Sequence, residues 1–550
     1  MLGPFGGLDA VFQASLLEWS ARHVWHPEIW RHLPIFHPAG NAIAFMDPLT
    51  AQAILVEPLH GLGMSSAALY NAAFLIALVL SCAATAALWQ ASGGDARSGG
   101  VAAMLLIGSP YTLAQLGHLN QLPPPGVPAV LAALICALTG WERGTATARY
   151  WWLMSAALIA QAAMGWYGFA YALLAAGIVL AGWVLRHHRT LARRPAARAA
   201  VLPLVVAAAG VWILATPHLE TAAREVDFTR HPGEVMWYSA DAQHLLNTGA
   251  YRAGPADLVG RGEDPAKRHL GVARQVLNPG WMALLLATVG FAARSGLTAR
   301  RREWGYLLLT AGVAGLVLAF GDSVGIPGTG RRVILPMGWL QQNLPPARAF
   351  RTVWRFSFLF TLAVAWWAAA GWAYLAGLSG LRARVLPAAA LILLLLESAP
   401  VAVPVVALPD QTRARPRRLS SEAVLTLPAP PDVYGEDLRE ARWLWRALAT
   451  GRPVTGGVSG WVPPWTRDLR HALAACEQGA ADPDDLFAKL AAVGVTRVEM
   501  FAADDDARLI YWRNLLRSRT GAPILAEGIE AYPLPTGPGP DFKAEPGPDG

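Results

Sequence analysis

The chain has 550 residues, of which 54% are hydrophobic and only 15% are charged, and its formal net charge is +7. Soluble domains carry about a quarter charged residues, so this composition argues against a soluble protein and favours an integral membrane protein. The basic residues cluster in short loops between apolar runs, so membrane topology explains the positive charge better than nucleic-acid binding does.

The first 64 residues carry acids in an apolar frame. Asp9 lies in GGLDAVFQASLLEW, and Asp47 directly precedes Pro48 in AFMDPL. A segment that mixes Trp, Phe and Pro with such acids can lie along the membrane interface as short amphipathic helices. In the plainest interpretation each acid caps the helix that follows it, because Asp is favoured at helix N-termini.

Apolar segments of bilayer-spanning length, about 17 to 25 residues each, follow this stretch. We predict about ten spans, near residues 66–89, 100–117, 126–140, 150–167, 169–186, 200–216, 279–293, 304–320, 355–377 and 385–404. The fourth and fifth of these are expected to turn tightly at Tyr167 and Gly168. The spans are poor in charged residues apart from Glu397 at the end of the last one.

Arginines mark alternate loops between these spans. The basic loops contain Arg97, Arg143, Arg149, Arg186, Arg189, Arg193, Arg194, Arg198, Arg294, Arg300, Arg301, Arg302, Arg382 and Arg384, whereas GHLNQLPPPG has neither Lys nor Arg. The positive-inside rule therefore predicts that the basic loops are cytoplasmic and that residues 1–64, 217–278, 321–354 and the C-terminal part lie outside. Because an outer first stretch requires a span ahead of it, we expect a missing leading span.

From about residue 405 the composition becomes polar, and strand-like and helix-like segments alternate. The strand-like segments are AVLTLP, VTRVEMF and ILAEGIEAYPL, and the helix-like ones are EDLREARWLWRALA, DLFAKLAAVG and ARLIYWRNLLRS. This alternation predicts a small α/β domain over residues 405–535. Residues 536–550 are rich in Pro and Gly and are expected to be disordered. The predicted fold class is therefore mainly α: a polytopic helical membrane bundle over 65–404 with a small extracytoplasmic α/β domain.

The order of these features resembles bacterial membrane proteins of the GT-C glycosyltransferase superfamily, including its YfhO-like branch. The resemblance rests on an acid early in the first outer stretch, PIFHPAGNAIAFMDPL, SPYTLAQLGHLNQ, LPPARAFRTVWRFSFLF, GRPVTGGVSGW and LAAVGVTRVEMF. It implies an enzyme of the bacterial cytoplasmic membrane that moves a sugar from a polyprenyl-phosphate carrier to an envelope glycan or lipid acceptor outside the cytoplasm. It also implies an essential acid in the first outer loop, for which Asp9 is the leading candidate and Asp47 the second.

The chemistry requires such an acid independently of the resemblance. When a lipid phosphate is displaced from an anomeric carbon, the acceptor hydroxyl loses its proton, and a carboxylate within hydrogen-bond reach can take it as general base. The departing phosphate requires a cation. Arg348, Arg351 and Arg355 are spaced by three and four residues, so on a helix they line one face, where guanidinium groups bind phosphate in bidentate fashion. Anchoring to lipid headgroups is the alternative function of these arginines.

Other polar and aromatic residues stand at the outer ends of spans. His118, Asn120 and Gln121 could orient a sugar or help to hold a divalent metal, although no cluster of metal ligands is evident and helix capping explains them equally well. Trp166 and Tyr167 could stack on a sugar ring, but an interfacial aromatic belt predicts the same residues. The long loop 217–278 is expected to cover the site and to select the acceptor.

Two functions without transferase chemistry stay open. One is a transporter or lipid-handling protein, which usually has ionisable residues in the middle of its spans. The other is an envelope-assembly protein whose outer domain binds partners. The low charge of the spans argues against coupled transport, so the sequence favours the transferase, with membrane lipid and a polyprenyl-phosphate-linked sugar as partners and no nucleic acid.

Overall fold

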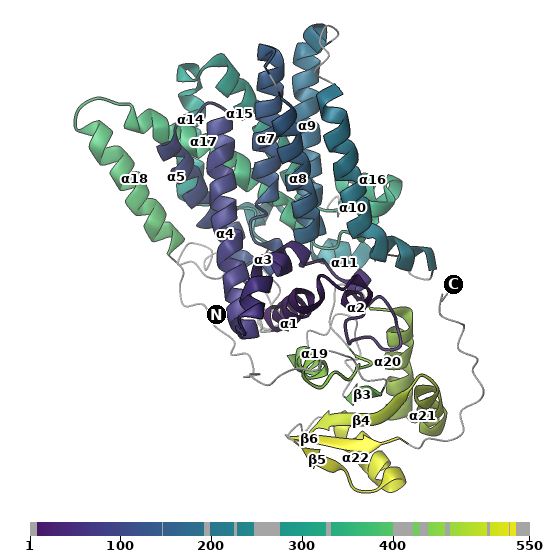
Figure 1. The fold of residues 1–550 in the computed structure, drawn as a ribbon. Helices are drawn as coiled ribbons and strands as arrows, with labels where there is room; N and C mark the ends of the chain where they lie inside the picture. Colours follow the sequence, from purple (N-terminus) through teal and green to yellow (C-terminus); the bar gives the residue numbers. More distant parts are fainter. Residues whose placement is uncertain are drawn as a thin grey trace.

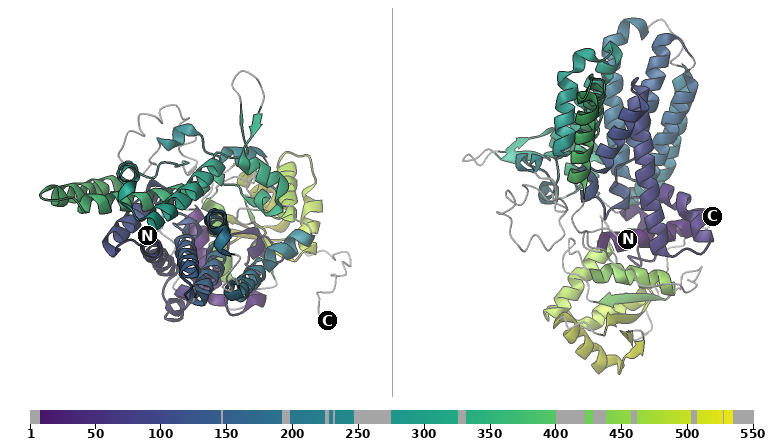
Figure 2. Two further views of the ribbon diagram at one scale, coloured as in Figure 1. Left: turned by 90° about the horizontal axis from the view of Figure 1, so that it is seen from above. Right: turned by 90° about the vertical axis from the view of Figure 1, so that its left-hand side faces the viewer.

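The computed structural model describes residues 8–145, 147–191, 198–224, 228–230, 232–246, 275–325, 332–399, 422–427, 438–456, 462–502, 507–526 and 528–534. A bundle of long helices forms one end of the molecule and a smaller α/β part forms the other (Figure 1). The first segment of the chain lies between them, and a second view confirms this order (Figure 2). The predicted disordered tail, 536–550, lies outside the described residues.

Ten long helices of the described residues form the bundle, one for each predicted span. They are α4 (Ser66–Ala91), α5 (Ala96–Ile107), α7 (Gly126–Arg143), α8 (Ala148–Met164), α9 (Trp166–Leu191), α10 (Arg198–Arg224), α14 (Trp281–Ala292), α15 (Ala299–Ala319), α17 (Phe358–Ala376) and α18 (Arg382–Ser398). Five of them, α4, α7, α9, α10 and α17, are long and apolar enough to cross a membrane, and the others are shorter or less apolar. The predicted fold class, a mainly helical membrane bundle with a small α/β part, is confirmed.

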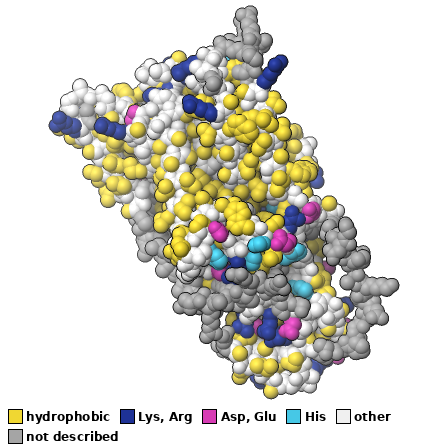
Figure 3. Space-filling view, viewed as in Figure 1, with side chains coloured by type: hydrophobic (Ala, Val, Ile, Leu, Met, Phe, Trp, Pro, Cys, Tyr) yellow, Lys and Arg dark blue, Asp and Glu magenta, His cyan; other side chains and the backbone are white. Residues whose placement is uncertain are grey.

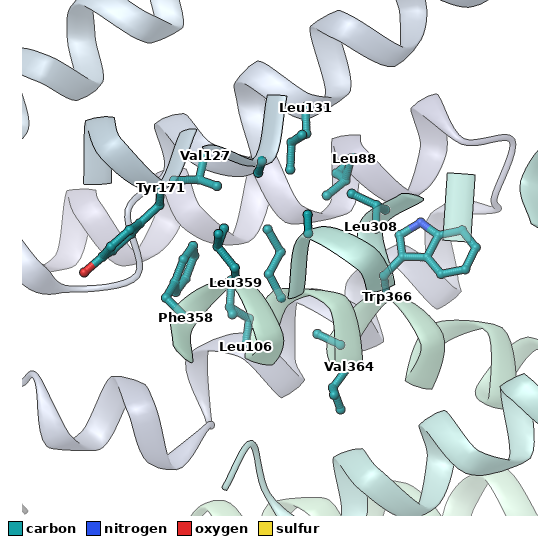
Figure 4. Packing of buried hydrophobic residues seen from close by; sticks show 14 of the residues in the cluster. Leu88, Leu106, Val127, Leu131, Tyr171, Leu308, Phe358, Leu359, Val364 and Trp366 are labelled. Atoms are coloured by element: carbon teal, nitrogen blue, oxygen red, sulfur yellow. The ribbon is translucent and has the colours of Figure 1, made fainter. Parts of the chain in front are cut away.

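Helix α17 forms the centre of the bundle, and nearly all of its residues up to Gly371 are buried. It packs closely on α14 because Gly290 and Gly371 face each other: a Cβ atom on Gly371 would lie 2.0 Å from the carbonyl oxygen of Leu286. Small residues at such crossings are typical of helix packing in membranes. Larger apolar side chains, including Leu359 and Trp366, fill the space towards the neighbouring helices (Figure 4).

Several of the 23 tryptophans belong to this core. Trp89, Trp183, Trp304 and Trp366 are almost fully buried, and the ring centroids of Trp89 and Trp366 lie 5.1 Å apart. Interfacial anchoring therefore explains only some of the indole rings. Packing against neighbouring helices explains the others, since a large aromatic ring buries much apolar surface.

The outer surface of the bundle is apolar. Hydrophobic side chains cover its visible face, and Lys and Arg side chains gather at the end away from the α/β part (Figure 3). On α10, Trp212 and Ile213 expose 66% and 69% of their surface, and α18 exposes Leu395 and Leu396. Such exposure suits side chains that face lipid. The direction of the bundle across the membrane stays a prediction.

The N-terminal segment forms short helices that lie across the end of the bundle. They are α1 (Leu8–His23), α2 (Pro27–Trp30), η1 (Ala42–Phe45) and α3 (Thr50–Gly61). Helix α1 packs between α3 and α4 on one side and α19 (Leu438–Thr450) of the α/β part on another. One apolar cluster joins these elements, with Leu17, Phe36 and Tyr70 at its centre and Trp445 contributed by α19.

Connections at this end of the bundle differ from the expected loops in two places. Helix α8 ends at Met164 and α9 begins at Trp166, so the turn is at Gly165 and not at Tyr167 and Gly168, which belong to α9. Here glycine leaves room for the chain opposite, since a Cβ on Gly165 would lie 3.0 Å from the carbonyl oxygen of Asn120. The predicted loop 217–278 begins later than expected because α10 continues to Arg224.

Shorter elements complete this end. They are α6 (Pro110–Ala114), η2 (Leu119–Gln121), α11 (Pro232–Trp237), η4 (Ala242–Leu245), β1 (Ser323–Gly325), β2 (Arg332–Ile334), α16 (Pro336–Asn343), η7 (Pro345–Ala349) and η8 (Val353–Ser357). At the opposite end, η6 (Arg294–Gly296) joins α14 to α15. Strands β1 and β2 pair as an antiparallel hairpin. Residues 247–274 of the predicted lid lie outside the described part of the chain.

The C-terminal part contains a four-stranded sheet in the order β3-β4-β6-β5. Its strands are β3 (Ala423–Leu427), β4 (Val495–Phe501), β5 (Ile524–Ala526) and β6 (Ile529–Pro533), and its helices are α19, α20 (Pro464–Glu477), α21 (Pro483–Ala492) and α22 (Ala507–Thr520). Strands β3 and β4 are parallel, and the other pairs are antiparallel. The segment ILAEGIEAYPL is a hairpin and not one strand, because Gly528, at φ +74°, forms the turn. Helix α20 is an addition to the predicted elements.

Candidate functional site

Helix α1 places two polar side chains against the turn that precedes α7. Asp9 and Gln13 are four residues apart, so they lie on the same face of the helix. The Nε2 atom of His118 lies 2.9 Å from Oδ2 of Asp9, and the side-chain amide of Gln13 donates to Oδ1 of Asn120 at 3.0 Å. Apolar residues of α1, among them Leu16, Leu17 and Trp19, pack into the cluster with α3, α4 and α19. Tertiary contacts on several sides of the helix therefore hold Asp9 in its direction.

Asp9 is enclosed by positive charge and still reachable. Its side chain keeps 35% of its surface exposed, whereas that of His118 keeps 14%. Burial by itself raises the pKa of Asp9, but His118, and after it Arg351 and Arg355, outweigh burial and hold the pKa below the ordinary carboxyl value. Asp9 is therefore ionised at neutral pH, and about a third of its side chain, 35%, is exposed.

Asp47 is held more tightly than Asp9. Its Oδ2 atom accepts hydrogen bonds from the side-chain amides of Asn120, at 2.9 Å, and Gln121, at 3.2 Å, and its Oδ1 atom accepts one from the backbone N–H of Trp166, at 3.4 Å. Burial raises the pKa of Asp47, and the bond from Trp166 and the charge of Arg355 offset only part of that effect. With both oxygens engaged, Asp47 joins η2 to the start of α9. The predicted cap of the helix after Pro48 is not what this carboxylate does here.

The two acids belong to one group of side chains. Asn120 links them, because it donates to Asp47 and accepts from Gln13, one turn along α1 from Asp9. Arg355 acts electrostatically on both carboxylates. The structure thus brings together the two predicted catalytic acids and all three predicted polar residues of the GHLNQ segment, across more than 100 residues of sequence.

The arginine-bearing segment does not form the predicted helix. It consists of two 3₁₀ turns, η7 and η8, separated by residues 350–352, of which Phe350 has an extended backbone. Successive prolines at its start and hydrogen bonds from other elements determine this path, so the three arginines do not share one helix face. Arg348 points away from the acids and donates to the backbone carbonyls of Gln341, at 3.0 Å, and Gln342, at 3.1 Å, near the end of α16.

Arg351 is held by Glu234, a residue of α11, and by Tyr238, which directly follows α11. Its guanidinium nitrogen lies 3.4 Å from a carboxylate oxygen of Glu234, and its Cζ atom lies 5.0 Å from the ring centroid of Tyr238. The same oxygen of Glu234 takes an ion pair from Arg230 at 3.2 Å. The Glu234 side chain is only 5% exposed, so its charge acts with little screening by water.

Among the described residues, the guanidinium of Arg355 has neither a carboxylate nor a backbone carbonyl as partner. Arg355 is 8% exposed, and among the described residues its Nε atom has no hydrogen-bond partner. Its Cζ atom lies 5.7 Å from the ring centroid of Tyr167. A buried guanidinium next to two carboxylates, but not bonded to either, is suited to a bidentate anion. Its position supports the predicted contact with phosphate.

Tyr167 joins the arginine segment to the bundle. Its hydroxyl oxygen accepts hydrogen bonds from the backbone N–H groups of Arg351, at 3.0 Å, and Thr352, at 2.8 Å. Its ring contacts Phe350 and lies 5.7 Å from the Cζ atom of Arg355, so Tyr167 positions the arginine segment, and its stacking on a sugar stays a prediction. Trp166 lies beside His218, with the two rings nearly perpendicular at 5.5 Å.

Two kinds of functional residue escaped the sequence analysis. Gln13 had a local signal, its spacing of four from Asp9, whereas Glu234 and His218 had none, since their contacts with Arg351 and Trp166 form only in the fold. Within the described residues, no group of three or more His, Cys, Asp or Glu side chains is arranged to hold a metal ion.

Comparison with known proteins identifies the fold. No family model matches the chain, and no curated protein matches it in sequence. The cryo-EM structure of the arabinofuranosyltransferase AftD from Mycobacteria is similar, with a TM-score of 0.51 and 17% identity over 95% of this chain and 39% of that chain. Two further structures are similar. For an oligosaccharyltransferase from Archaeoglobus fulgidus the TM-score is 0.46 and the identity 13%, over 90% of this chain and 66% of that chain. For ArnT from Cupriavidus metallidurans the TM-score is 0.38 and the identity 13%, over 98% of this chain and 95% of that chain.

The likeness to AftD shows a shared fold, so the predicted GT-C fold is confirmed. This chain spans about two fifths of the length of AftD, at 39%, and just under two thirds of the archaeal structure, at 66%. The YfhO-like branch stays a prediction.

Proposed function

We propose that this chain, which has the fold of GT-C glycosyltransferases, is a glycosyltransferase of the bacterial cytoplasmic membrane. In this proposal it moves a sugar from a polyprenyl-phosphate carrier to a glycan or lipid acceptor of the cell envelope, on the side of the membrane where the α/β part lies. The observation that supports it most strongly is an ionised, partly exposed Asp9 beside two arginines, one of which has no paired carboxylate. The fold of an arabinofuranosyltransferase agrees with it.

Asp9 is assigned the role of general base. Oδ2 is held by His118, and among the described residues Oδ1 has no hydrogen-bond partner, so Oδ1 takes the proton of the acceptor hydroxyl. As this proton leaves, the acceptor oxygen forms a bond to the anomeric carbon, and the bond from that carbon to the phosphate oxygen breaks. A base in this position contributes roughly 10²–10⁴-fold to the rate. Asp9 is ionised at neutral pH and can therefore take the proton, although its lowered pKa makes it a weaker base than an ordinary carboxylate.

The arginines are assigned to the phosphate. Negative charge grows on the phosphate oxygen as its bond to the sugar breaks, and preorganised cations in a poorly solvated site stabilise that charge. Arg355 offers an unpaired guanidinium, and Arg351, fixed by Glu234, adds a second positive charge close to Asp9. Arg348 has no part in this assignment, because backbone carbonyls of α16 bind its guanidinium.

Asp47 is assigned a supporting role. Its three hydrogen bonds hold the turn of His118 and Asn120 against the start of α9, and thus keep His118 in place beside Asp9. The raised pKa makes Asp47 the stronger base of the two, but hydrogen bonds engage both of its oxygens, so the role of base is assigned to Asp9 on geometry and not on basicity.

The test is transfer by the purified full chain in proteoliposomes, with a panel of synthetic polyprenyl-phosphate sugars and short glycan acceptors. Release of polyprenyl phosphate is measured for the wild type, Asp9→Asn and Asp241→Asn. Asp241 is a matched control, because it also pairs with a histidine at 3.0 Å, His244, but its side chain is 60% exposed. We expect a loss of roughly 10²–10⁴-fold for Asp9→Asn and no loss for Asp241→Asn.

Two outcomes would contradict the proposal. An equal effect of the two substitutions would remove the special role of Asp9. Carrier binding by the wild type without transfer from any donor would favour a lipid-handling protein.

A further inference from the structure

A second polar site lies at the opposite end of the bundle. A cavity of about 310 Å³ opens there between the last turns of α9 and the first turns of α15. Arg186, His187, Ala299, Arg302, Glu303 and Tyr306 line it. Because α9 begins at the acid site with Trp166 and runs through the bundle, this cavity is separated from Asp9 by the length of a spanning helix.

The carboxylates around this cavity are already engaged. Glu142 accepts a hydrogen bond from the indole N–H of Trp183 at 2.7 Å and forms an ion pair with Arg300. Glu303 lies 3.6 Å from a guanidinium nitrogen of Arg186. The ring of His187 stands between them, 3.5 Å from Glu142 and 3.9 Å from Glu303.

Positive charge is in excess at this cavity. Three arginines, at 186, 300 and 302, accompany the two carboxylates, and among the described residues the guanidinium of Arg302 has no ion-pair or hydrogen-bond partner. Ala299 is the first residue of α15, which has 21 residues, so the positive end of the helix dipole also faces the cavity. Part of the positive charge at the cavity therefore comes from the backbone at the start of α15, and the rest comes from the arginine side chains.

The cavity lies where a lipid headgroup would lie. It is at the end of the apolar belt, where Lys and Arg side chains gather (Figure 3). Next to Arg186, Leu185 exposes 75% of its surface, and Leu180, farther along α9, exposes 38%. Such side chains suit contact with acyl chains, and basic pockets between membrane helices suit anionic headgroups.

We infer that this cavity binds the phosphate headgroup of an anionic phospholipid. Arg302 and Arg186 contact the phosphate oxygens, and Glu303 keeps Arg186 directed into the cavity. The inference stands independently of transferase activity, because it involves none of the residues near Asp9. Its chemistry is shared by free phosphate compounds, so the experiment must separate the two sources.

The experiment measures phosphatidylglycerol bound to the purified full chain by native mass spectrometry, after exchange into detergent with defined lipid. Phosphatidylethanolamine and inorganic phosphate are used in parallel. Arg302→Gln removes a side chain that is outside every described ion pair, so the fold should persist. We expect it to weaken phosphatidylglycerol binding about tenfold, as for loss of one charge-assisted contact.

The control is Arg384→Gln, which removes an exposed arginine from the first turn of α18, at the same end of the bundle. General attraction between basic loops and acidic lipid would give equal losses for Arg302→Gln and Arg384→Gln, and this result would overturn the inference. Equal binding of phosphatidylethanolamine would also overturn it. Displacement of the lipid by inorganic phosphate at similar concentration would assign the cavity to a soluble phosphate compound instead.

Discussion

The hydroxyl of Tyr167 offers a test of how the fold holds the arginine segment. Replacing Tyr167 with Phe removes one oxygen and keeps the ring that lies under Arg355. That oxygen accepts the backbone N–H groups of Arg351 and Thr352 at 3.0 and 2.8 Å. The substitution therefore leaves two backbone donors without their acceptor, and changes little else in the site.

The expected magnitude follows from burial. Thr352 is 3% exposed, so its unpaired N–H carries the full penalty of a buried donor, about 1–3 kcal/mol. Arg351 is partly exposed, so water replaces part of its lost bond. Together we expect a loss of about 2 kcal/mol, which corresponds to roughly a 30-fold change in an equilibrium constant. Because this segment carries Arg351 and Arg355, which are proposed to bind the donor phosphate, the loss should raise the KM for the donor more than it lowers kcat.

The assay compares donor KM, kcat and urea unfolding of the wild type, Tyr167→Phe and Tyr374→Phe in the same detergent. Tyr374 is 50% exposed on α17 and makes no described hydrogen bond through its hydroxyl, so its substitution controls for loss of a phenol oxygen. If Tyr167→Phe leaves both the donor KM and the unfolding midpoint at the wild-type values, the hydroxyl does not position the arginine segment and the reasoning fails.

Three further predictions concern charge, packing and pH. Glu234→Gln should raise the donor KM about tenfold, because the 5%-exposed carboxylate is the ion-pair partner of Arg351; an unchanged KM in steady-state assays would exclude this role. Gly371→Ala should destabilise the chain by about 1–3 kcal/mol in urea unfolding, since its Cβ would meet the carbonyl oxygen of Leu286, and wild-type stability would show that α14 and α17 pack less closely. The pKa of Asp9 is lowered, because positive neighbours outweigh burial, so this carboxylate stabilises the fold above the ordinary carboxyl pKa and loses that effect as pH falls through its own lower value. The acid limb of kcat/KM should therefore lie below the range of an ordinary carboxyl group, and a limb above that range would contradict the assignment.

The helices could be predicted from sequence because membrane insertion is a local property. An apolar run must satisfy its backbone hydrogen bonds internally, so hydropathy alone locates α4, α9 and α17. The alternation of strands and helices in the C-terminal part could also be predicted, because the residue pattern of each strand or helix lies within a short stretch of sequence. Asp9 and Asp47 could be proposed because the resemblance to GT-C proteins implies an essential acid in the first outer loop and because the chemistry calls for a general base.

The details of the site could not be predicted in this way, because they depend on tertiary contacts. The spacing of Arg348, Arg351 and Arg355 suggests one helix face, but Tyr167 bonds the backbone between them and the segment turns instead. The number of tryptophans likewise does not predict their location, because composition cannot distinguish an indole packed in the core, such as Trp366, from one at the membrane interface.

The most direct test separates carrier binding, assigned to Arg355, from sugar transfer, assigned to Asp9. Affinity for sugar-free polyprenyl phosphate and the rate of a single turnover are measured for Asp9→Asn and for Arg355→Gln. If Asp9 is the base and Arg355 holds the phosphate, Asp9→Asn should bind the carrier normally and lose turnover by roughly 10²–10⁴-fold, whereas Arg355→Gln should lose carrier binding. Normal turnover in Asp9→Asn, with the donor bound, would contradict the account.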